Sequence, residues 1–532
     1  MPIRMVDDPE NQGDYNEQND NSGGGGRSNP GGGAGGGLLN FLPLLLSLFG
    51  GGGGGGKKVI LILVVAVGAF FLMRNGGSGG SGISDIISKF ATGGNLDPNE
   101  FKKASVYEGL SDDNGKNPLP ESVSLLQYAP KRMNQGKQGS CVAWSSGYAA
   151  RTILESTSTR TDPNSVAFSP AFLYNNISLG DGDCQGSYII RAMEFMQKNG
   201  AVPFQQFPYD ENDCTRQANR DLFSSAGEYK IHGFTRLTDD AGVSALNYRA
   251  IKEHLAKDAP VVIGMMVGGS FMQDMMGQKV WHPTDDDYTQ QGFGGHAMCV
   301  IGYDDRIEGG AFQIMNSWGP EWGDNGTAYV RYGDFRRFVR EAYGMDPLPK
   351  TGAALNVDFE CNIGLVNAST KQYIPLRAGS GNVFTTVSPI QKGTTFKLEL
   401  KNALECYVYI FGQDTDNSSY VLFPYKPIHS AYFGITGYRL FPRKESLQAD
   451  SIGTKDRMAI VVSKQPLDYV ALNAAINNSS QSTYAGKLNE AISANAITGV
   501  RFSNSNAGNI YFKAASGEEK NIVGCIVEID KQ

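Results

Sequence analysis

The sequence predicts an α+β protein in which two folded domains follow a disordered tail and one transmembrane helix. Three observations lead to this prediction. Glycine clusters in the first part of the 532-residue chain, one uncharged apolar run follows, and the sequence beyond residue 350 changes from mixed to strand-rich. The predicted segments are a Gly-rich tail (1–56), a transmembrane helix (57–75), a linker (76–118), a first domain (119–350) and a β-rich accessory domain (357–532).

The N-terminal tail is rich in Asn, Asp and Gly and has almost no aromatic residues before Phe41. Such a segment cannot bury enough apolar surface to offset the entropy of ordering it, so we expect it to be disordered. Residues 38–49 (LLNFLPLLLSLF) are apolar, but the run is short and Pro43 breaks it. This pattern favours an interfacial or re-entrant segment over a membrane span.

Residues 59–73 (VILILVVAVGAFFLM) form the membrane candidate, because they carry no charge and lie between Lys57, Lys58 and Arg74. At about 1.5 Å per residue the run is shorter than the roughly 30 Å hydrocarbon layer, but flanking glycines can extend the helix and lysines can snorkel. The alternative is a buried core helix, which the glycine-rich flanks disfavour. The lysine excess predicts a cytoplasmic tail and places the chain after Arg74 outside the cytoplasm.

The C-terminal domain reads as a β-sandwich with an appended helix. Residues 396–400 (FKLEL) alternate apolar and polar side chains, as a half-buried strand does. Further runs rich in β-branched and aromatic residues are 407–411, 420–423, 458–462 and 522–529. Residues 467–494 are less β-like and predict one or two helices. In the linker, residues 83–90 are a short helix candidate.

Composition and charge argue against several classes of site. The net charge is −7 and no basic run exceeds a pair, which disfavours a nucleic-acid partner. The glycine runs lack the Lys-Ser/Thr that follows a phosphate loop. Residues 285–287 (DDD) suggest calcium only weakly, since their spacing matches no known loop, and a solvated loop is the better interpretation. We therefore expect neither a cofactor nor a metal.

Cys141 is the one cysteine of seven that opens a predicted helix directly after a turn. It follows residues 136–140 (GKQGS) and precedes the Ala-containing run 142–155. A helix N-terminus and an imidazolium partner lower the pKa of a thiol from about 8.5, which makes a thiolate nucleophile accessible near neutral pH. The alternative for an isolated cysteine is a small buried apolar residue.

His296 is the histidine whose setting suits chemistry best. It follows residues 292–295 (GFGG) and opens residues 297–303 (AMCVIGY), a buried-strand pattern that would hold an imidazole rigidly. The other four histidines lie in polar or loop-like sequence. A satisfied core histidine would be the better interpretation if His296 stood alone, but Asn316 follows in residues 316–326 (NSWGPEWGDNG).

Three blocks of the sequence that contain these residues resemble the signature blocks of the papain family (C1) of cysteine peptidases in their order and separation. They are NQGKQGSCVAWS at 134–145, GGHAMCVIGYD at 294–304 and NSWGPEWGDNG at 316–326. The resemblance covers about residues 119–345 and implies a two-lobed fold with a helical lobe and a β-barrel-like lobe. We refer to residues 119–350 as the papain-like domain and to residues 357–532 as the β-rich domain.

The resemblance implies a role for each matching residue. Cys141 would attack the scissile carbonyl as a thiolate, and His296 would pair with it and protonate the leaving amine. Asn316 would orient the imidazole, and Trp318 would shield that hydrogen bond from water. Gln135 and the backbone N–H of Cys141 would bind the developing oxyanion.

Substrate contacts follow from a second likeness. Residues 184–188 (CQGSY) resemble the family's Cys-Asn-Gly-Gly stretch, whose backbone pairs with an extended substrate. Ser187 replaces the second glycine, a change that would narrow the cleft. Trp322 would lie on the leaving-group side, while Tyr188 and Ala297 would line opposite sides of one pocket. The implied substrate-binding positions are Gly186, Ser187, Tyr188, Ala297, Trp318 and Trp322.

The sequence also departs from the family. Val142 replaces the usual tryptophan, and Gln138 replaces the cysteine that usually pairs with the position of Cys184. The spacing and the expected extracytoplasmic location suggest a disulfide between Cys184 and Cys214 instead. Residues 83–118 are too short for a full inhibitory propeptide, so either control is absent or another part of the chain limits access to the cleft.

The leading hypothesis is a membrane-anchored cysteine endopeptidase that hydrolyses protein or peptide substrates through an acyl-enzyme. Residues 396–472 resemble a β-rich domain of unknown function often appended to bacterial peptidases and kinases, and this domain would position the enzyme or bind substrate or a protein partner. Two alternatives stay open. One is a scaffold or binding protein that leaves the site unused, and the other is an acyl transferase (transpeptidase) with the same residues.

Overall fold

The computed structural model describes residues 3–8, 92–180, 184–238, 246–350, 358–425, 429–443, 445–515 and 520–532. The predicted transmembrane helix, the apolar residues 38–49 and the helix candidate at 83–90 lie outside these described residues. Among the helices of the described ranges, none is long and apolar enough to cross a membrane.

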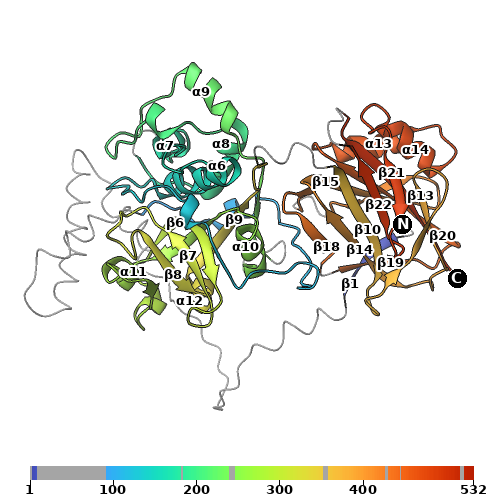
Figure 1. Cartoon of the computed structure of the whole chain (residues 1–532), viewed down its shortest axis with the longest axis horizontal. Helices are drawn as coiled ribbons and strands as arrows, with labels where there is room; N and C mark the ends of the chain where they lie inside the picture. Colours follow the sequence, from blue (N-terminus) through green and yellow to red (C-terminus); the bar gives the residue numbers. More distant parts are fainter. Residues whose placement is uncertain are drawn as a thin grey trace, which may run out of the picture. The chain divides into compact units, whose positions relative to one another are not determined.

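One side of the papain-like domain is helical, as Figure 1 shows. A continuous helical run starts at Cys141, where the sequence predicts a helix, and comprises α5 (Cys141–Ala143), the π-helix η4 (Trp144–Arg151) and α6 (Thr152–Thr159). Local signals set the ends of the neighbouring helices. Ser169 accepts a hydrogen bond from Phe172 N and Pro170 occupies the first turn of its helix. The other helices on this side are α7 (Pro170–Ile177), α8 (Ile189–Asn199) and α9 (Arg220–Ala226).

The other side of this domain is a sheet with β6 (Gly294–Asp304) near its centre (Figure 1). β6 carries the apolar run that the sequence assigns to a buried strand, and its residues from His296 to Tyr303 are buried. The described strands run in the order β3 (Phe234–Arg236), β9 (Val339–Met345), β4 (Val261–Val267), β6, β7 (Ala311–Met315), β8 (Thr327–Arg331) and β5 (Val280–Trp281), with β2 (Ser122–Ser124) also on β6. Three helices accompany the sheet: α10 (Tyr248–Leu255), α11 (Gly269–Gln273) and α12 (Tyr332–Phe338).

The β-rich domain is a sandwich of two sheets. The first sheet holds β1 (Ile3–Asp7), β19 (Glu445–Ala449), β14 (Thr395–Asn402), β10 (Phe359–Asn367), β22 (Ile510–Ala514) and β21 (Arg501–Asn504), with β11 (Tyr373–Ile374) and β18 (Gly437–Phe441) at its side. The second holds β12 (Leu376–Ala378), β13 (Val383–Thr386), β23 (Ile522–Asp530), β20 (Lys455–Ser463), β15 (Cys406–Gln413) and β16 (Ser419–Phe423), with β17 (Tyr432–Phe433) on β15. All five runs predicted as strands are strands.

The period of two explains why the second sheet has nearly continuous apolar strands. In β15, Val408 and Ile410 point into the core between the sheets, while Tyr409 and Phe411 belong to a second apolar cluster. That second cluster also contains residues of α13 (Tyr469–Asn478) and α14 (Tyr484–Ile492), which lie side by side in Figure 1. The sheet is therefore buried on both faces, and the predicted helical region covers its outer one.

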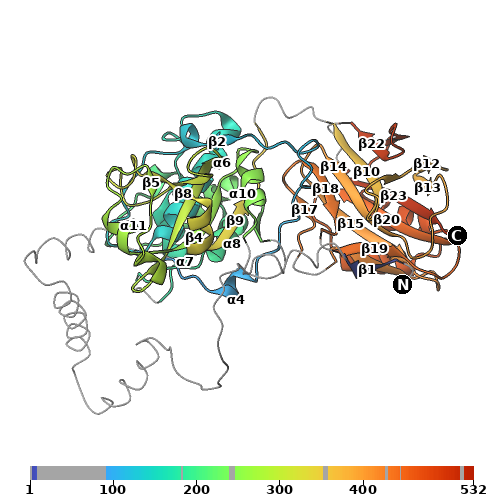
Figure 2. The same ribbon diagram turned by 90° about the horizontal axis from the view of Figure 1, so that it is seen from below.

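The structure corrects two of the predicted segments. Residues 3–8, assigned to the disordered tail, contain β1, which pairs antiparallel with β19 beside the marked N-terminus (Figure 2). Ile3 is fully buried, and Asp8 forms an ion pair with Lys397 at 2.6 Å. Residues 92–118, assigned to a linker, include α4 (Pro98–Phe101), whose Phe101 is fully buried. Both segments were missed because each depends on partners far away in the sequence.

Candidate active site

Cys141 is the first residue of α5, and its side chain is 0% exposed. The backbone N–H of Ala297 donates to Cys141 Sγ at 3.4 Å, which puts the residue after His296 against the thiol. Burial raises the pKa of the Cys141 thiol to about 12, although the backbone amides of Ala297, Val142 and Gly93 act in the opposite direction. In this buried state the thiol is therefore neutral at physiological pH.

His296 is oriented by Asn316. His296 Nε2 lies 2.8 Å from Asn316 Oδ1, and that oxygen also accepts the backbone N–H of Ser317 at 2.7 Å. Because a backbone N–H can only donate, the oxygen of the amide must face it, and His296 Nε2 must carry a proton. His296 Nδ1 is buried without a hydrogen-bond partner among the described residues, which leaves it as the acceptor for a thiol proton. Burial lowers the pKa of His296 to about 4, while the hydrogen bond to Asn316 raises it.

One tryptophan packs on His296 and a second supports the first. The Trp318 ring stacks on the His296 imidazole with centroids 4.4 Å apart and an interplanar angle of 23°. Trp322 is fully buried, donates from Nε1 to the carbonyl of Phe271 at 2.9 Å and packs edge-on against Trp318. Trp322 thus supports Trp318 and presents no exposed surface of its own to a leaving group.

Gln135 is fully buried and held at both ends of its side-chain amide. Its Nε2 donates to Gln138 O at 2.9 Å, and its Oε1 accepts from Ser317 Oγ at 2.6 Å. Tyr209 OH also donates to the Gln135 backbone carbonyl at 2.7 Å. An amide nitrogen has two hydrogens, so one N–H of Gln135 remains for another acceptor.

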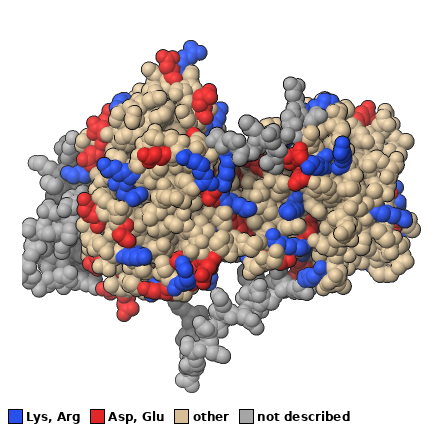
Figure 3. All heavy atoms as spheres, in the orientation of Figure 1, with Lys and Arg blue, Asp and Glu red and all other residues tan. Residues whose placement is uncertain are grey.

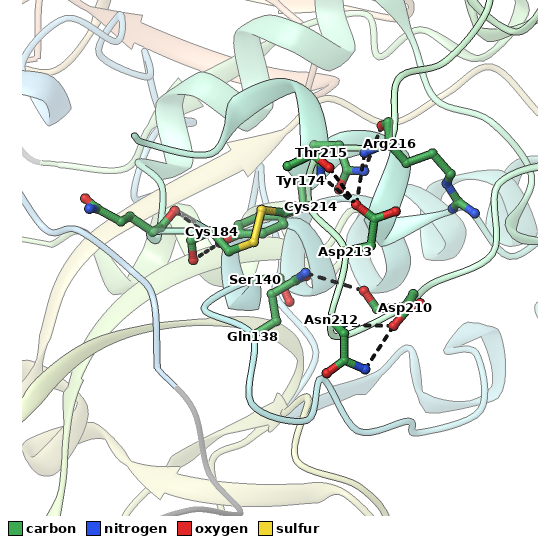
Figure 4. The surroundings of a disulfide bond; sticks show 12 residues. Gln138, Ser140, Tyr174, Cys184, Asp210, Asn212, Asp213, Cys214, Thr215 and Arg216 are labelled. Carbon is green, nitrogen blue, oxygen red and sulfur yellow. Dashed lines mark hydrogen bonds between the residues drawn. A yellow bond between two sulfur atoms is a disulfide. The ribbon is translucent and has the colours of Figure 1, made fainter. Parts of the chain in front are cut away.

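Cys184 and Cys214 are joined by a disulfide with a Cα–Cα distance of 5.6 Å (Figure 4). This disulfide takes the place of the bridge that is usual in the family. The usual bridge cannot form here because Gln138 stands at the position of its second cysteine. Tyr174 OH holds the same stretch by donating to the carbonyls of Cys184 at 2.6 Å and Gln185 at 3.1 Å. The turn at Cys214 is fixed by Asp213, whose Oδ1 accepts from Thr215 N at 2.9 Å.

Ser187 does not narrow the cleft, contrary to the expectation from its side chain. Its hydroxyl is buried and donates to Ile177 O at 2.8 Å. Its backbone groups remain available for pairing, with Ser187 N donating to Gly93 O and Ser187 O accepting from Asn95 N, both at 2.9 Å. Gly186 lies against the same segment, since a Cβ on it would meet Gly93 O at 2.0 Å. The chain's own residues 93–95 therefore occupy the predicted substrate-binding backbone.

The remaining predicted positions differ in exposure. Ala297 is buried beneath Cys141, whereas Tyr188 is half-buried at the start of α8, next to Arg191. Sequence reasoning missed Ser317 and Tyr209, which position Gln135. Ser317 follows Asn316 directly in a signature block and was therefore detectable, but nothing in the sequence near Tyr209 points to Gln135. It also missed residues 93–95, because backbone contacts leave no side-chain signal.

Comparison with known proteins agrees with this geometry. A family model described as papain family cysteine protease matches residues 120–343. Cathepsin B-like CP2 of Giardia intestinalis is 28% identical over 232 residues, which cover 42% of this chain and 72% of that protein. Cathepsin K of Mus musculus is 26% identical over 215 residues, which cover 40% of this chain and 60% of that protein.

Among solved structures, xylellain, a cysteine protease from Xylella fastidiosa, has 21% sequence identity and a TM-score of 0.41, over 49% of this chain and 97% of its own. The family match spans the three blocks that contain Cys141, His296 and Asn316. Residues 120–343 therefore form a papain family cysteine protease domain, and this chain is a cysteine-type peptidase.

Proposed function

We propose that this peptidase is an endopeptidase that cleaves polypeptides through an acyl-enzyme on Cys141, with His296 as base and acid and Asn316 as the orienting group. The observation that carries the proposal is the hydrogen bond of 2.8 Å between His296 Nε2 and Asn316 Oδ1. This bond leaves Nδ1 unprotonated in the neutral imidazole, on the strand whose next residue, Ala297, touches the thiol.

The proposed reaction begins when His296 Nδ1 takes the proton of Cys141 and the thiolate attacks the scissile carbonyl. The resulting oxyanion would accept hydrogen bonds from the backbone N–H of Cys141 and the remaining N–H of Gln135. His296 then returns the proton to the leaving amine, and the acyl-enzyme forms. Water deprotonated by the same nitrogen hydrolyses the thioester and restores the thiol.

A polypeptide substrate fits the shape of the cleft. Residues 92–96 pass through it as part of a continuous chain and pair with it through the backbone of Ser187 and Gly295. A cleft that accommodates these internal residues of the chain does not require a free terminus in its substrate. This supports internal cleavage over removal of terminal residues.

The charged surface agrees with a peptide substrate. On the face seen in Figure 3, Lys and Arg are interspersed with Asp and Glu and form no extended basic stripe. This face therefore lacks the basic footprint that nucleic acids attract, and the net charge of the chain is −7. A protein partner for the β-rich domain is part of the proposal and rests on the sequence alone.

Membrane attachment is a separate proposal that rests on the sequence of residues 57–75. It would place the papain-like domain outside the cytoplasm, on the periplasmic side, where the disulfide of Cys184 and Cys214 suits an oxidising compartment. The ladder between β1 and β19 sets a condition on this proposal. If the chain crosses the membrane once, residues 3–8 and the β-rich domain lie on opposite sides of it. The ladder between β1 and β19 can then form within one chain only if the chain crosses a second time before the β-rich domain.

Peptide hydrolysis by the full chain tests the proposed function. We expect turnover of an internally quenched peptide, labelling of Cys141 by an epoxide thiol reagent, and loss of both in Cys141→Ala. His296→Ala should lose turnover while it keeps the fold, as judged by thermal unfolding. If neither the wild-type chain nor Gly93→Leu, which removes the contacts of residues 93–95 with the cleft, cleaves any member of a diverse peptide library while Cys141 is labelled in both, the endopeptidase proposal is wrong.

A further inference from the structure

Residues 92–118, which we call the strap, contact both the active-site cleft and the β-rich domain. Residues 92–96 form its first part, the plug, and lie over Cys141. Residues 108–117 form its second part, the anchor, and bind the β-rich domain. Between them Phe101 is buried in the papain-like domain, and Arg236 N donates to Ser105 O at 2.9 Å.

The plug is held in the cleft by backbone hydrogen bonds on both of its sides. Gly94 pairs with Ser187 as a parallel bridge, in which Gly93 O accepts from Ser187 N and Asn95 N donates to Ser187 O. Gly94 N also donates to Gly295 O at 3.1 Å. The Gly93 carbonyl is therefore turned toward Ser187, and the group that reaches the Cys141 thiol is the Gly93 backbone amide.

The fit between plug and cleft depends on glycine on both sides. A Cβ on Gly93 would lie 2.1 Å from Gly139 O, and one on Gly295 would lie 2.1 Å from Gly94 O. Such contacts are too short for any side chain to be accommodated without movement of the backbone. Leu96 then fills the space above Gly264, where a Cβ would meet Leu96 Cδ2 at 2.4 Å. Cys141 and His296 are 0% exposed in this arrangement.

The anchor is held by buried polar groups of the β-rich domain. The Glu108 carbonyl accepts from Arg439 Nε at 2.9 Å, and Arg439 is 0% exposed. The Glu108 carboxylate lies 3.2 Å from Tyr425 OH and 3.3 Å from His429 Nδ1. These contacts place a strap carboxylate within the polar interior of that domain, where release would leave several groups without partners.

Asn117 and its neighbours add a second point of attachment. The Asn117 side chain donates to Tyr438 O at 2.9 Å and accepts from Tyr438 N at 3.0 Å. Ser111 N donates to the same Tyr438 carbonyl at 2.9 Å. Lys116 forms an ion pair with Glu399 and donates to Tyr373 OH at 2.9 Å. The anchor therefore contacts strands β14 and β18 and the start of β11 of the β-rich domain. It also contacts α10 of the papain-like domain, where Glu253 Oε2 accepts from Leu110 N at 3.1 Å and Arg249 donates to Ser111 O at 3.3 Å.

We propose that the β-rich domain regulates the peptidase by holding the anchor, which keeps the plug over Cys141 and the enzyme latent. This inference rests on the proposed function and names its regulation. Weakening the anchor shifts the equilibrium of the strap toward release, and the cleft opens to substrate. The role thus given to the β-rich domain is control of access to the site.

The experiment measures the rate at which an epoxide thiol reagent alkylates Cys141 in the full chain, a readout that does not require peptide turnover. Gly93→Leu should raise this rate about tenfold or more by destroying the fit of the plug. The anchor variant Glu108→Ala with Asn117→Ala should raise it as well. Lys102→Ala, an exposed strap position between plug and anchor, is the matched control and should leave the rate unchanged.

A combined variant separates regulation from loss of folding. If the anchor acts through the plug, adding the anchor substitutions to Gly93→Leu should produce no further increase, since the cleft is already open. Thermal unfolding must show an intact β-rich domain in each variant. Faster alkylation in Gly93→Leu but not in the folded anchor variant would overturn the role of the β-rich domain. An unchanged alkylation rate in both variants would contradict the proposal that the plug covers Cys141. Faster alkylation without peptide turnover would instead contradict only the endopeptidase proposal.

Discussion

Ser317 links Gln135 to Asn316: its hydroxyl donates to Gln135 Oε1 at 2.6 Å, while its backbone N–H donates to Asn316 Oδ1 at 2.7 Å. One residue thus positions the amide proposed for the oxyanion and the amide that orients His296. The side-chain contact can be removed without disturbing the backbone contact. Ser317 therefore allows the oxyanion role of Gln135 to be tested indirectly.

Ser317→Ala should lower kcat by about tenfold with little change in KM, because Gln135 loses the group that fixes its amide. Gln135→Ala should lower kcat by roughly 100-fold, the usual cost of losing one oxyanion donor. Steady-state kinetics on enzyme normalised by active-site titration measure both effects. Ser317→Thr keeps the hydroxyl and should recover most of the activity. An unchanged kcat in Ser317→Ala would contradict this positioning role.

The pH dependence of alkylation should differ between covered and open sites. With the plug in place, burial holds the pKa of Cys141 at about 12 and that of His296 at about 4, so both groups are neutral between these values. Alkylation of the wild type should then be slow at every pH between about 5 and about 9, because the thiol stays protonated throughout this range. In Gly93→Leu, water and the exposed imidazolium should stabilise the thiolate, and alkylation should be fast at neutral pH. Equal pH profiles for the two proteins would argue against this difference in ionisation.

Breaking the disulfide should destabilise the papain-like domain and weaken substrate binding. The bridge closes a loop with a sequence separation of 30, for which chain entropy predicts a loss of about 3–4 kcal/mol in Cys214→Ser. KM should rise because Cys184 lies two residues before Gly186 in the substrate-pairing stretch. Thermal unfolding without reductant and peptide kinetics measure these effects. The double variant with Cys184→Ser should match the single one, and a further loss in it would show that Cys184 has another role.

Asp346 should make the folded chain less stable as pH rises. Burial, followed by repulsion from Glu405, raises the pKa of Asp346 to about 8. An unfolded Asp ionises near pH 4, so between about pH 4 and pH 8 the folded state binds the extra proton. Its stabilising contribution is complete below this window and is lost as pH rises through it. In Asp346→Asn, which cannot ionise, the unfolding temperature relative to wild type should increase from pH 5 to about pH 8 and then level off. A constant difference between the two proteins would contradict the assignment.

The pairing of β1 with β19 can be tested in membranes. Arg4 stands opposite Gln448 in this ladder, so Arg4→Cys with Gln448→Cys should be joined by a short thiol crosslinker within one chain. Asn99→Cys with Gln448→Cys, which pairs a residue of α4 with the same strand, is the control. Crosslinking in intact membranes would show that residues 3–8 and the β-rich domain share one side of the bilayer. Its absence there, with crosslinking in detergent, would support a single crossing.

The sequence by itself determined the elements with strong local or family-wide patterns. Cys141 after a turn, His296 at the start of an apolar strand and Asn316 before Trp318 were identifiable because the chemistry requires those side chains at those positions. The strands of the β-rich domain were identifiable because burial on one or both faces imposes a period of two or a continuous apolar run.

Only the tertiary structure decided which distant parts of the chain these elements contact. The plug contacts the cleft through backbone groups and glycines, which leave no side-chain pattern to read. β1 is five residues long and pairs with a strand more than 400 positions away, with Ile3 opposite Ala449 of β19. The side chain of Ser187 leaves the cleft open because its hydroxyl donates to Ile177 O, a contact that the local sequence does not indicate. Local sequence reports propensity and burial, whereas these contacts depend on the path of the whole chain.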